Sequence, residues 1–346
     1  MRKVVKQVCG IDVAQKELVV SFGRIYDDLT PEIHAHKCFP NNAKGFTALL
    51  NWVKGLMEPA IAVGYVMEAT GVYHEGLAYF LHGQGHHVSI VLPNKISNYA
   101  RTLKIKTVTD KTASEAITRF GLERKLDNWT PPAPVFKKLR QLTRERDQLV
   151  QSRTVAKNQL HAEQSEAEPN AGTVARVKKQ IAFLDKQEQE IKAEIAVLVN
   201  ENEQVKKKVK LVSSIPGVAM WTAVTVLAET NGFELTRSKK QIASYAGLDV
   251  KEKQSGTSVK AKPRISKKGN KYLRKAMHMP ALSAIRHNQR FKAIFARLVA
   301  KHGIKMKAAV AVQRKLLELI YTIFKTEKPY DREYLQKTRE QQNATP

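Results

Sequence analysis

The sequence predicts a mixed α/β domain, then a helical hairpin and a basic, mainly α carboxy-terminal domain. Strand and helix patterns alternate between residues 4 and about 125. Two long heptad patterns flank a turn at residues 168–172, and helical patterns continue from Val209. A chain of 346 residues has room for several domains. We expect four parts: the α/β domain at residues 1–130, a helical coiled-coil linker and oligomerisation hairpin at 135–204, the basic domain at 205–330, and a polar tail at 331–346.

Short apolar runs separated by turn residues predict the first domain. The expected strands are residues 8–14, 18–22, 62–68 and 88–92, and the expected helices surround residues 46–53 and 77–81. The first two strands can form a hairpin, and Asn41 or Asn42 can cap the first helix. A β-hairpin followed by a β-α-β unit favours a mixed sheet.

Two apolar seams predict the helical hairpin. They comprise Leu139, Leu142, Leu149, Ala156 and Leu160, then Ile181, Leu184, Ile191, Ile195 and Leu198. Arg146, Arg153 and Glu188 interrupt the seams with charges. Seams of this kind are typical of two helices packed within one chain, and equally of a coiled coil with another subunit.

The charge balance indicates the class of partner. Lys and Arg number 59 against 32 Asp and Glu, a formal net charge of +27. Such an excess favours a polyanion, with nucleic acid as the default, although an anionic membrane surface fits the charge alone. Two cysteines do not make a disulfide framework, and no apolar run is long enough for a signal peptide or membrane span. We therefore expect a cytoplasmic protein that does not enter a membrane.

Three acidic residues lie where strands end or a helix begins. Asp12 ends the first apolar strand, and Glu68 ends the third. Two acids on neighbouring strand ends can share a divalent metal, which offsets their repulsion. Asp110 is expected in the first turn of a helix, where the helix dipole also favours an acid without any metal. A solvated or capping role therefore remains open for each residue.

Several motifs together resemble one family. They are residues 10–14 (GIDVA), 67–73 (MEATGVY), 106–112 (KTVTDKT), 211–218 (LVSSIPGV), 243–248 (ASYAGL), 254–259 (QSGTSV) and 266–274 (SKKGNKYLR). In this order they resemble the DEDD-type insertion-sequence transposases, over about residues 4–125 and 205–330. The resemblance implies a first domain like the RuvC junction resolvase, with the ribonuclease H fold.

The resemblance also implies a mechanism. An acidic quartet binds Mg²⁺ or Mn²⁺, and Asp12, Glu68 and Asp110 match three of its members. A serine, matched by Ser255, attacks DNA and forms a phosphoserine link. A structured guide (bridge) RNA selects donor and target DNA. Recombination needs more than one active site, which predicts a dimer or tetramer. The implied location is the nucleoid of a bacterial or archaeal cytoplasm.

The residues around Ser255 suit such a reaction. Gly256 allows a phosphate to approach the backbone, and residues 260–275 are rich in Lys and Arg and contain no acid. The predicted nucleic-acid ligands are Lys260, Lys262, Arg264, Lys267, Lys268, Lys271 and Arg274. A serine needs an activating base or metal, and this composition is also that of a plain polar loop.

One position departs from the family pattern. Where the fourth acid is expected, three residues after Asp110, the chain has Ala113. Ser114 shares a helix face with Asp110 and is the polar neighbour best placed to substitute. Two alternatives stay open: a metal-dependent junction-resolving nuclease that uses only the acids, with water as nucleophile, and, because of Ala113, a catalytically inactive nucleic-acid-binding protein.

Overall fold

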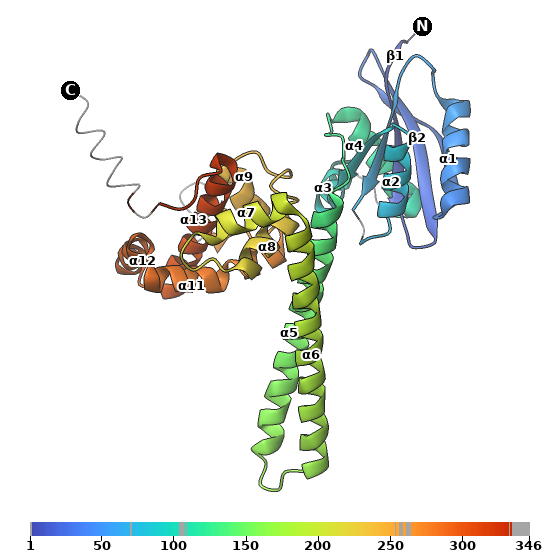
Figure 1. The fold of residues 1–346 in the computed structure, drawn as a ribbon. Helices are drawn as coiled ribbons and strands as arrows, with labels where there is room; N and C mark the ends of the chain where they lie inside the picture. The colour runs from blue at the N-terminus through green and yellow to red at the C-terminus, as the bar shows by residue number, and fades with distance from the viewer. Residues whose placement is uncertain are drawn as a thin grey trace, which may run out of the picture. The chain divides into compact units, whose positions relative to one another are not determined.

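The computed structural model of this chain contains two compact units, residues 1–131 and 132–346. It describes residues 2–69, 71–103, 107, 109–252, 254–255, 259–260, 264–331 and 333, with only the backbone of residues 254, 255, 259 and 260. Figure 1 shows the elements along the chain. The helical hairpin and the carboxy-terminal helices belong to the same unit.

The first unit is built on a five-stranded mixed sheet. Its strands are β1 (Val4–Val13), β2 (Glu17–Tyr26), β3 (Pro31–Pro40), β4 (Val63–Glu68) and β5 (His87–Val91). Their order is β3-β2-β1-β4-β5. The first three strands are antiparallel neighbours, whereas β1, β4 and β5 run parallel. The predicted mixed sheet is confirmed, including the hairpin in which Ile11 pairs with Val20.

The edge strand β3 was not expected from the sequence. Its sequence, PEIHAHKCFP, contains few large apolar residues, and Phe39 is its only buried one. An edge strand needs less burial than a central one because one side carries no neighbouring strand. Backbone pairing with β2, from Glu17 opposite Pro40 to Ile25 opposite Pro31, holds it in the sheet instead.

Helices pack on both faces of this sheet. α1 (Ala43–Leu56) and α2 (Glu75–Gly83) share a core with one face, and α3 (Pro93–Ala100) and α4 (Asp110–Glu123) with the other; a short 3-10 turn, Arg101–Leu103, follows α3. Asn42 caps α1 by accepting a hydrogen bond from the Gly45 amide at 3.0 Å, as predicted. Successive strand residues face opposite sides, so every second residue of β1 faces α4.

Glycines bring α4 unusually close to the sheet. A Cβ atom built on Gly10 would lie 2.3 Å from Thr118 Oγ1 and 2.4 Å from the Thr118 backbone nitrogen. Further along the helix, a Cβ on Gly121 would lie 2.8 Å from side-chain carbons of Val8 and Val66. Lys6 Nζ donates to the carbonyl oxygens of Gly121 and of Arg124, the latter at 2.7 Å. These contacts fix α4 along β1.

Gly10→Ala is expected to lower stability by about 1–3 kcal/mol or more, because overpacking must displace backbone rather than a flexible side chain. Gly64→Ala is the matched control, since the nearest atom to its added Cβ lies at 3.9 Å. Thermal unfolding of both variants measures the effect. Equal melting temperatures would show that α4 can shift without cost.

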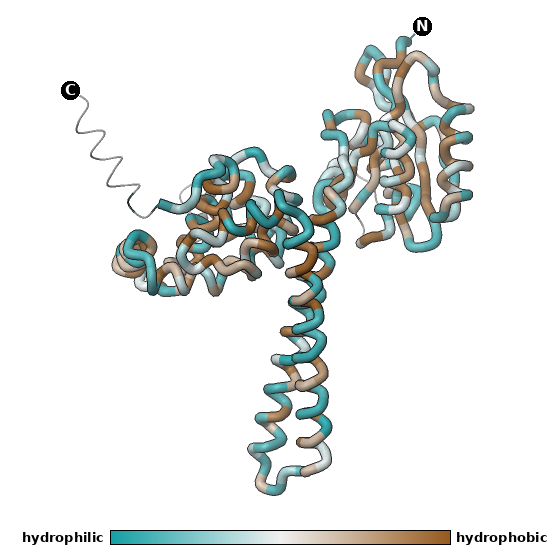
Figure 2. Tube along the Cα trace, viewed as in Figure 1, coloured by the Kyte–Doolittle hydropathy of each residue, from teal (hydrophilic) through white to brown (hydrophobic). Residues whose placement is uncertain are grey.

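The second unit begins with the predicted helical hairpin. α5 (Pro134–Gln164) and α6 (Ala171–Glu201) pack along their length, and the turn lies at the end remote from the other helices (Figure 1). Figure 2 shows mostly hydrophilic residues along both helices, with hydrophobic positions at intervals. Seam residues of both helices are buried, among them Leu139, Leu142, Ala156, Leu184, Ile191 and Ile195.

The charged interruptions of the two seams pair with each other. Glu188 is only 2% exposed, and its carboxylate accepts hydrogen bonds from Arg146 at 2.8 Å and Lys192 at 3.1 Å, and also from Arg153. Arg153 bonds Asp185 as well. A buried charge needs such partners, and it also fixes the register of the two helices. This cluster explains why an amphipathic seam contains charges.

The remaining helices form the core of the second unit. They are α7 (Glu203–Ser213), α8 (Met220–Glu229), α9 (Lys239–Tyr245), α10 (Lys271–Ala276), α11 (His278–His287), α12 (Gln289–His302) and α13 (Lys305–Thr326). α13 supplies fully buried Val312, Leu316 and Ile320. Two short strand pairs, β6 (Val250–Lys251) with β9 (Arg264–Ile265) and β7 (Gln254–Ser255) with β8 (Val259–Lys260), follow α9. The mainly α character predicted for this region is confirmed.

Within the described residues, none of the helices combines the length and the apolar character that a bilayer crossing requires.

Candidate active site

Two of the predicted acids lie side by side on the sheet. The last pair between the parallel strands β1 and β4 is Ile11 with Met67, and Asp12 and Glu68 are the next residues of these two strands. The residues two positions earlier, Gly10 and Val66, both contact α4. Because side chains alternate along a strand, Asp12 and Glu68 project from the face that α4 covers. Both acids therefore occupy one end of one face of the sheet.

The third acid approaches this end from α4. Asp110 is the first residue of the helix, and Thr109 caps it by accepting a hydrogen bond from the Thr112 amide at 3.2 Å. The helix runs antiparallel to β1, because Gly121 packs at Val8 and Thr118 packs at Gly10. Its amino-terminal end therefore lies toward the carboxyl end of β1, where Asp12 is.

The two aspartates are electrostatically coupled. Burial, and next the negative charge of Asp110, raise the pKa of Asp12, while a hydrogen bond from the Val13 backbone lowers it less. Like charges at short range disfavour ionisation unless a cation compensates them. In the described residues, however, no three Asp, Glu, His or Cys side chains lie close enough together to hold a metal ion. The structure thus brings the acids to one end of the sheet without closing a metal shell.

Ser114, the expected substitute for the missing fourth acid, has a different role. Its side chain is fully buried, and its hydroxyl lies 2.7 Å from Ser21 Oγ and donates to the Lys111 carbonyl at 2.8 Å. One helical turn after Ser114, Thr118 Oγ1 donates to the backbone oxygens of Ser21 and Ser114. These hydroxyls hold α4 against β2, so Ser114 is not available as a ligand.

Ser255 lies in the second unit, on the short strand β7. Its backbone pairs with Val259 of β8, and the segment that carries both strands is closed at its base by β6 and β9, where Val250 pairs with Ile265. Gly256 and Ser258 lie outside the described residues. Just beyond the base, Asp249 Oδ1 accepts a 2.5 Å hydrogen bond from the Ser266 hydroxyl. The serine is therefore carried on a short hairpin whose base is anchored.

The predicted cations near Ser255 differ in their roles. The side chains of Arg264, Lys267, Lys268 and Lys271 are exposed. The side chain of Lys260 and the whole of Lys262 lie outside the described residues. Arg274 is half-buried and donates from Nη1 to the Ala246 carbonyl at 2.7 Å, which is a structural contact.

Sequence reasoning missed a second group of cations. The acid-free stretch does not end at residue 275 but extends from residue 253 to residue 317. It covers α11, α12 and the start of α13, which pack against one another. The exposed cations of this second surface are Arg286, Arg290, Lys292, Arg297, Lys301, Lys305 and Lys307. Among the described side chains, none of the seven has an ion-pair partner. The absence of acids was the signal that could have revealed it.

Replacing Arg290 and Arg297 together by Ala is expected to weaken nucleic-acid binding and to reduce the salt slope of log Kd by about one per lost phosphate contact. The two residues lie seven positions apart and therefore share a face of α12. Arg2→Ala is the control, because Arg2 is already paired with Asp28 and Glu32. Binding titrations at several salt concentrations measure both. An unchanged slope would exclude the second surface from phosphate contact.

Comparison with known proteins places this geometry in a family. Residues 9–164, which contain the three acids, match a family described as "Transposase", and residues 209–296, which contain Ser255, match the "Transposase IS116/IS110/IS902 family". Two relatives, each named "Pilin gene-inverting protein", come from Moraxella lacunata and Moraxella bovis. Each is 29% identical over 332 residues, covering 94% of this chain and 98% of the relative.

A solved structure, T. thermophilus RuvC in complex with Holliday junction substrate, is 12% identical and covers 33% of this chain and 90% of its own, with a TM-score of 0.26. That score is too low to support an argument about function. Together the two matches contain the three acids, the first helix of the hairpin and the serine segment, and they cover more than half of the chain. The chain therefore belongs to the IS116/IS110/IS902 family of transposases, which are DNA-processing enzymes.

Proposed function

We propose that this transposase cuts and rejoins DNA through a covalent phosphoserine at Ser255, with Asp12, Glu68 and Asp110 as ligands of Mg²⁺ or Mn²⁺. The observation that carries the metal assignment is the convergence of the acids. Asp12 and Glu68 lie at the ends of neighbouring parallel strands, and the negative charge of Asp110 helps to raise the pKa of Asp12. The relatives named for gene inversion support the strand-joining chemistry, because an inversion requires both cutting and rejoining.

The acids fit a hard divalent cation chemically, since carboxylate oxygens are its preferred ligands. Such an ion would neutralise charge on the phosphate that reacts. The repulsion that raises the pKa of Asp12 would be relieved when it binds. Glu68, one strand away on the same face, would be the third ligand.

Ser255 would carry the covalent step. Its Oγ attacks the phosphorus of a DNA phosphodiester and loses its proton, a new P–Oγ bond forms, and the bond to one sugar oxygen breaks. The released sugar hydroxyl takes up a proton. Rejoining is the reverse attack by a sugar hydroxyl of the new strand. The exposed cations Arg264, Lys267, Lys268 and Lys271 would lower the cost of charge on the phosphate.

The proposed partners are donor and target DNA, a structured guide RNA, and further copies of the chain. The two cationic surfaces suit the backbones of several nucleic-acid strands at once. RNA helices are read mainly through shape and backbone contacts, which the exposed Lys and Arg of α10 to α13 can make. More than one active site is needed to exchange strands, which supports a homo-oligomer.

Ser255→Ala is expected to abolish both cleavage and the covalent link. The test incubates wild-type protein, Mg²⁺ and element-end DNA with RNA transcribed from the element's non-coding end. The cleaved complex is then trapped and its modified peptide mapped. Ser258→Ala, which removes a hydroxyl three residues away, is the matched control and should retain activity.

Other outcomes select the alternatives. An adduct on Ser258, or cleavage that survives Ser255→Ala, overturns the serine assignment, and adduct-free cleavage indicates a nuclease that uses water. Absence of cleavage with either Mg²⁺ or Mn²⁺ indicates an inactive nucleic-acid-binding protein, which Ala113 at the fourth acidic position favours. Recombination that persists without RNA, after ribonuclease treatment, excludes the guided mechanism.

A further inference from the structure

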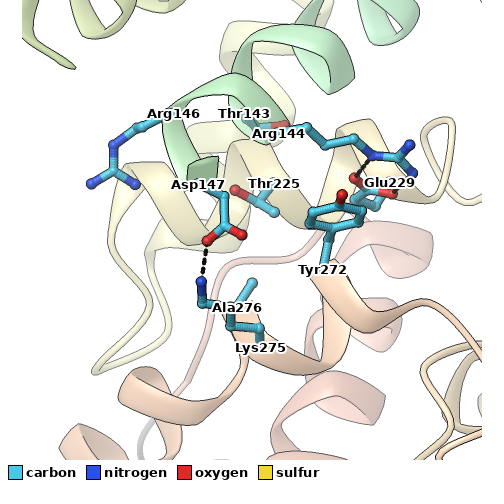
Figure 3. A pocket seen from close by; sticks show the side chains of 9 residues that line it. All are labelled: Thr143, Arg144, Arg146, Asp147, Thr225, Glu229, Tyr272, Lys275 and Ala276. Carbon is cyan, nitrogen blue, oxygen red and sulfur yellow. Dashed lines mark hydrogen bonds and ion pairs between the residues drawn. The ribbon is translucent and has the colours of Figure 1, made fainter. Parts of the chain in front are cut away.

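A buried glutamate joins three elements of the second unit. Glu229 ends α8 and is only 1% exposed. Arg144 of α5 binds its carboxylate through two hydrogen bonds, at 2.7 Å from Nε and 2.8 Å from Nη2. Asn270 donates to the same carboxylate from Nδ2 at 2.6 Å. Figure 3 shows the Arg144–Glu229 pair beside Tyr272.

Asn270 also begins α10. Its Oδ1 accepts a hydrogen bond from the Leu273 backbone amide at 3.0 Å, which caps the helix. The backbone N–H of Asn270 donates to the Tyr245 carbonyl at 2.7 Å. The Tyr245 hydroxyl in turn donates to the backbone oxygen of Glu229 at 2.9 Å. Three polar groups of Asn270 are thus hydrogen-bonded: Oδ1, the backbone N–H and Nδ2. Of these three, Nδ2 is the one that bonds the Glu229 carboxylate.

The chain just before Asn270 is the base of the Ser255 segment. The Lys267 amide donates to the Gly247 carbonyl at 3.1 Å, and the Ser266 amide to the Asp249 carbonyl at 2.8 Å. Gly269 fits so tightly that an added Cβ would lie 2.4 Å from the Tyr245 carbonyl oxygen. The backbone from β9 to α10 therefore follows the end of α9 closely. A displacement of Asn270 would be transmitted along these few residues to β9.

A carboxylate in this place needs an explanation. Burying a charge costs several kcal/mol, and well-packed apolar residues would stabilise a core as well or better. What a charged group adds is direction, because bidentate hydrogen bonds fix the orientation of both partners. A cavity of about 90 Å³ borders the cluster, lined in part by Thr143, Thr225 and Tyr272 (Figure 3), so dense packing does not hold these side chains on that side.

We propose that Glu229 is a positioning residue for the Ser255 segment: it ties the α10 cap, Asn270, to α5 of the hairpin and thereby sets the base from which the serine is presented. This inference rests on the proposed function in one respect, that the hydroxyl of Ser255 is the group that reacts with DNA. The hairpin helix and the serine segment are linked through one carboxylate, so a change at Arg144 reaches the segment through hydrogen bonds.

The test exchanges the two hydrogen-bonding partners. Asn270→Asp preserves the helix cap, because Asp caps as well as Asn, but it turns the donor that faces Glu229 into a second carboxylate. The double variant Asn270→Asp with Glu229→Gln restores the donor–acceptor pair between positions 229 and 270 in exchanged places, although it leaves Arg144 one acceptor oxygen instead of two. Three quantities are measured for each full-length protein: DNA affinity, the rate of covalent adduct formation, and backbone hydrogen exchange over residues 264–276.

Asn270→Asp should slow adduct formation about a hundredfold, since a misplacement of about 1 Å can cost this much. DNA affinity should change less than about threefold, which separates positioning from unfolding. Exchange over residues 264–270 should accelerate. The double variant should recover both rates in part, because the bond between positions 229 and 270 is restored while one bond from Arg144 is lost. A residue that acts only as a helix cap would leave the single variant unchanged.

The inference would be overturned if Asn270→Asp formed the adduct and exchanged its amide hydrogens at the wild-type rates. It would also be overturned if the double variant recovered neither rate. Failure of the proposed function looks different. If the wild-type protein forms no adduct on Ser255, the phosphoserine mechanism fails, while hydrogen exchange still decides whether Glu229 holds the segment. A variant that does not fold is recognised by its melting curve, and the double variant then supplies the comparison.

Discussion

Asp12→Asn, Glu68→Gln and Asp110→Asn are each expected to reduce DNA cleavage by at least about a hundredfold, the loss that removal of one electrostatic stabiliser commonly causes. The fold should remain intact. The ionised form of Asp12 is already disfavoured by burial and by the charge of Asp110. Removing either charge therefore relieves repulsion and should leave the free energy of unfolding unchanged or higher at neutral pH.

The measurement is cleavage at several concentrations of Mg²⁺ and Mn²⁺, with thermal unfolding alongside. Asp27→Asn is the matched control, because Asp27 is exposed and lies just after β2, at the opposite end of the β1–β2 pair. Wild-type turnover by any one of the three variants removes that residue from the site. Retained cleavage in all three would contradict the acidic metal site as a whole.

Glu188→Ala is expected to destabilise the second unit by about 3–5 kcal/mol, because it leaves Arg146, Arg153 and Lys192 without the carboxylate they share. Glu190→Ala is the control. Glu190 lies two residues away on the same helix and forms only an exposed pair with Lys186 at 4.0 Å, worth at most about 0.5 kcal/mol. Denaturant unfolding of both variants gives the difference directly.

The loss in Glu188→Ala should depend on pH. Burial raises the pKa of Glu188, but the hydrogen bonds from Lys192, Arg146 and Arg153 lower it more, so the net shift is downward. A carboxyl group with a lowered pKa stabilises the folded state fully at neutral pH, and this contribution disappears as the pH falls below the ordinary carboxylate range. The two proteins should therefore converge in stability in acid. If the difference in free energy of unfolding between the two proteins stayed constant down to strongly acidic pH, the ionised form of Glu188 would not be the form that stabilises the fold.

Most of the fold could be predicted because burial leaves regular patterns. Apolar runs located four strands of the sheet, and heptad spacing located both helices of the hairpin. The edge strand β3 could not be found in this way, because pairing with β2 rather than burial holds it. The role of Arg146, Arg153 and Glu188 was also hidden, since a charge in a seam reveals its partner only when the two helices are aligned.

The candidate site was predictable to a lesser extent. Strand order explains why Asp12 and Glu68 lie at the ends of neighbouring strands, and a β-α-β pattern suggests that order. The substitution by Ser114 could not be judged, because helix spacing places it near Asp110 without showing that Ser21 already binds its hydroxyl. Glu229 carried no sequence signal at all, since its partners Arg144 and Asn270 lie far from it along the chain.

The contacts between α4 and the sheet have a mechanical consequence. The helix is held at three levels, by Ser114 on Ser21, by Thr118 against Gly10, and by Lys6 at its last carbonyls. A helix clamped along its length cannot slide or tilt by an ångström without breaking several contacts together. While these contacts hold, the backbone spacing between Asp12 and Asp110 should change little. The large movements that strand exchange demands must be absorbed elsewhere in the chain, while the two aspartates provide a rigid reference point.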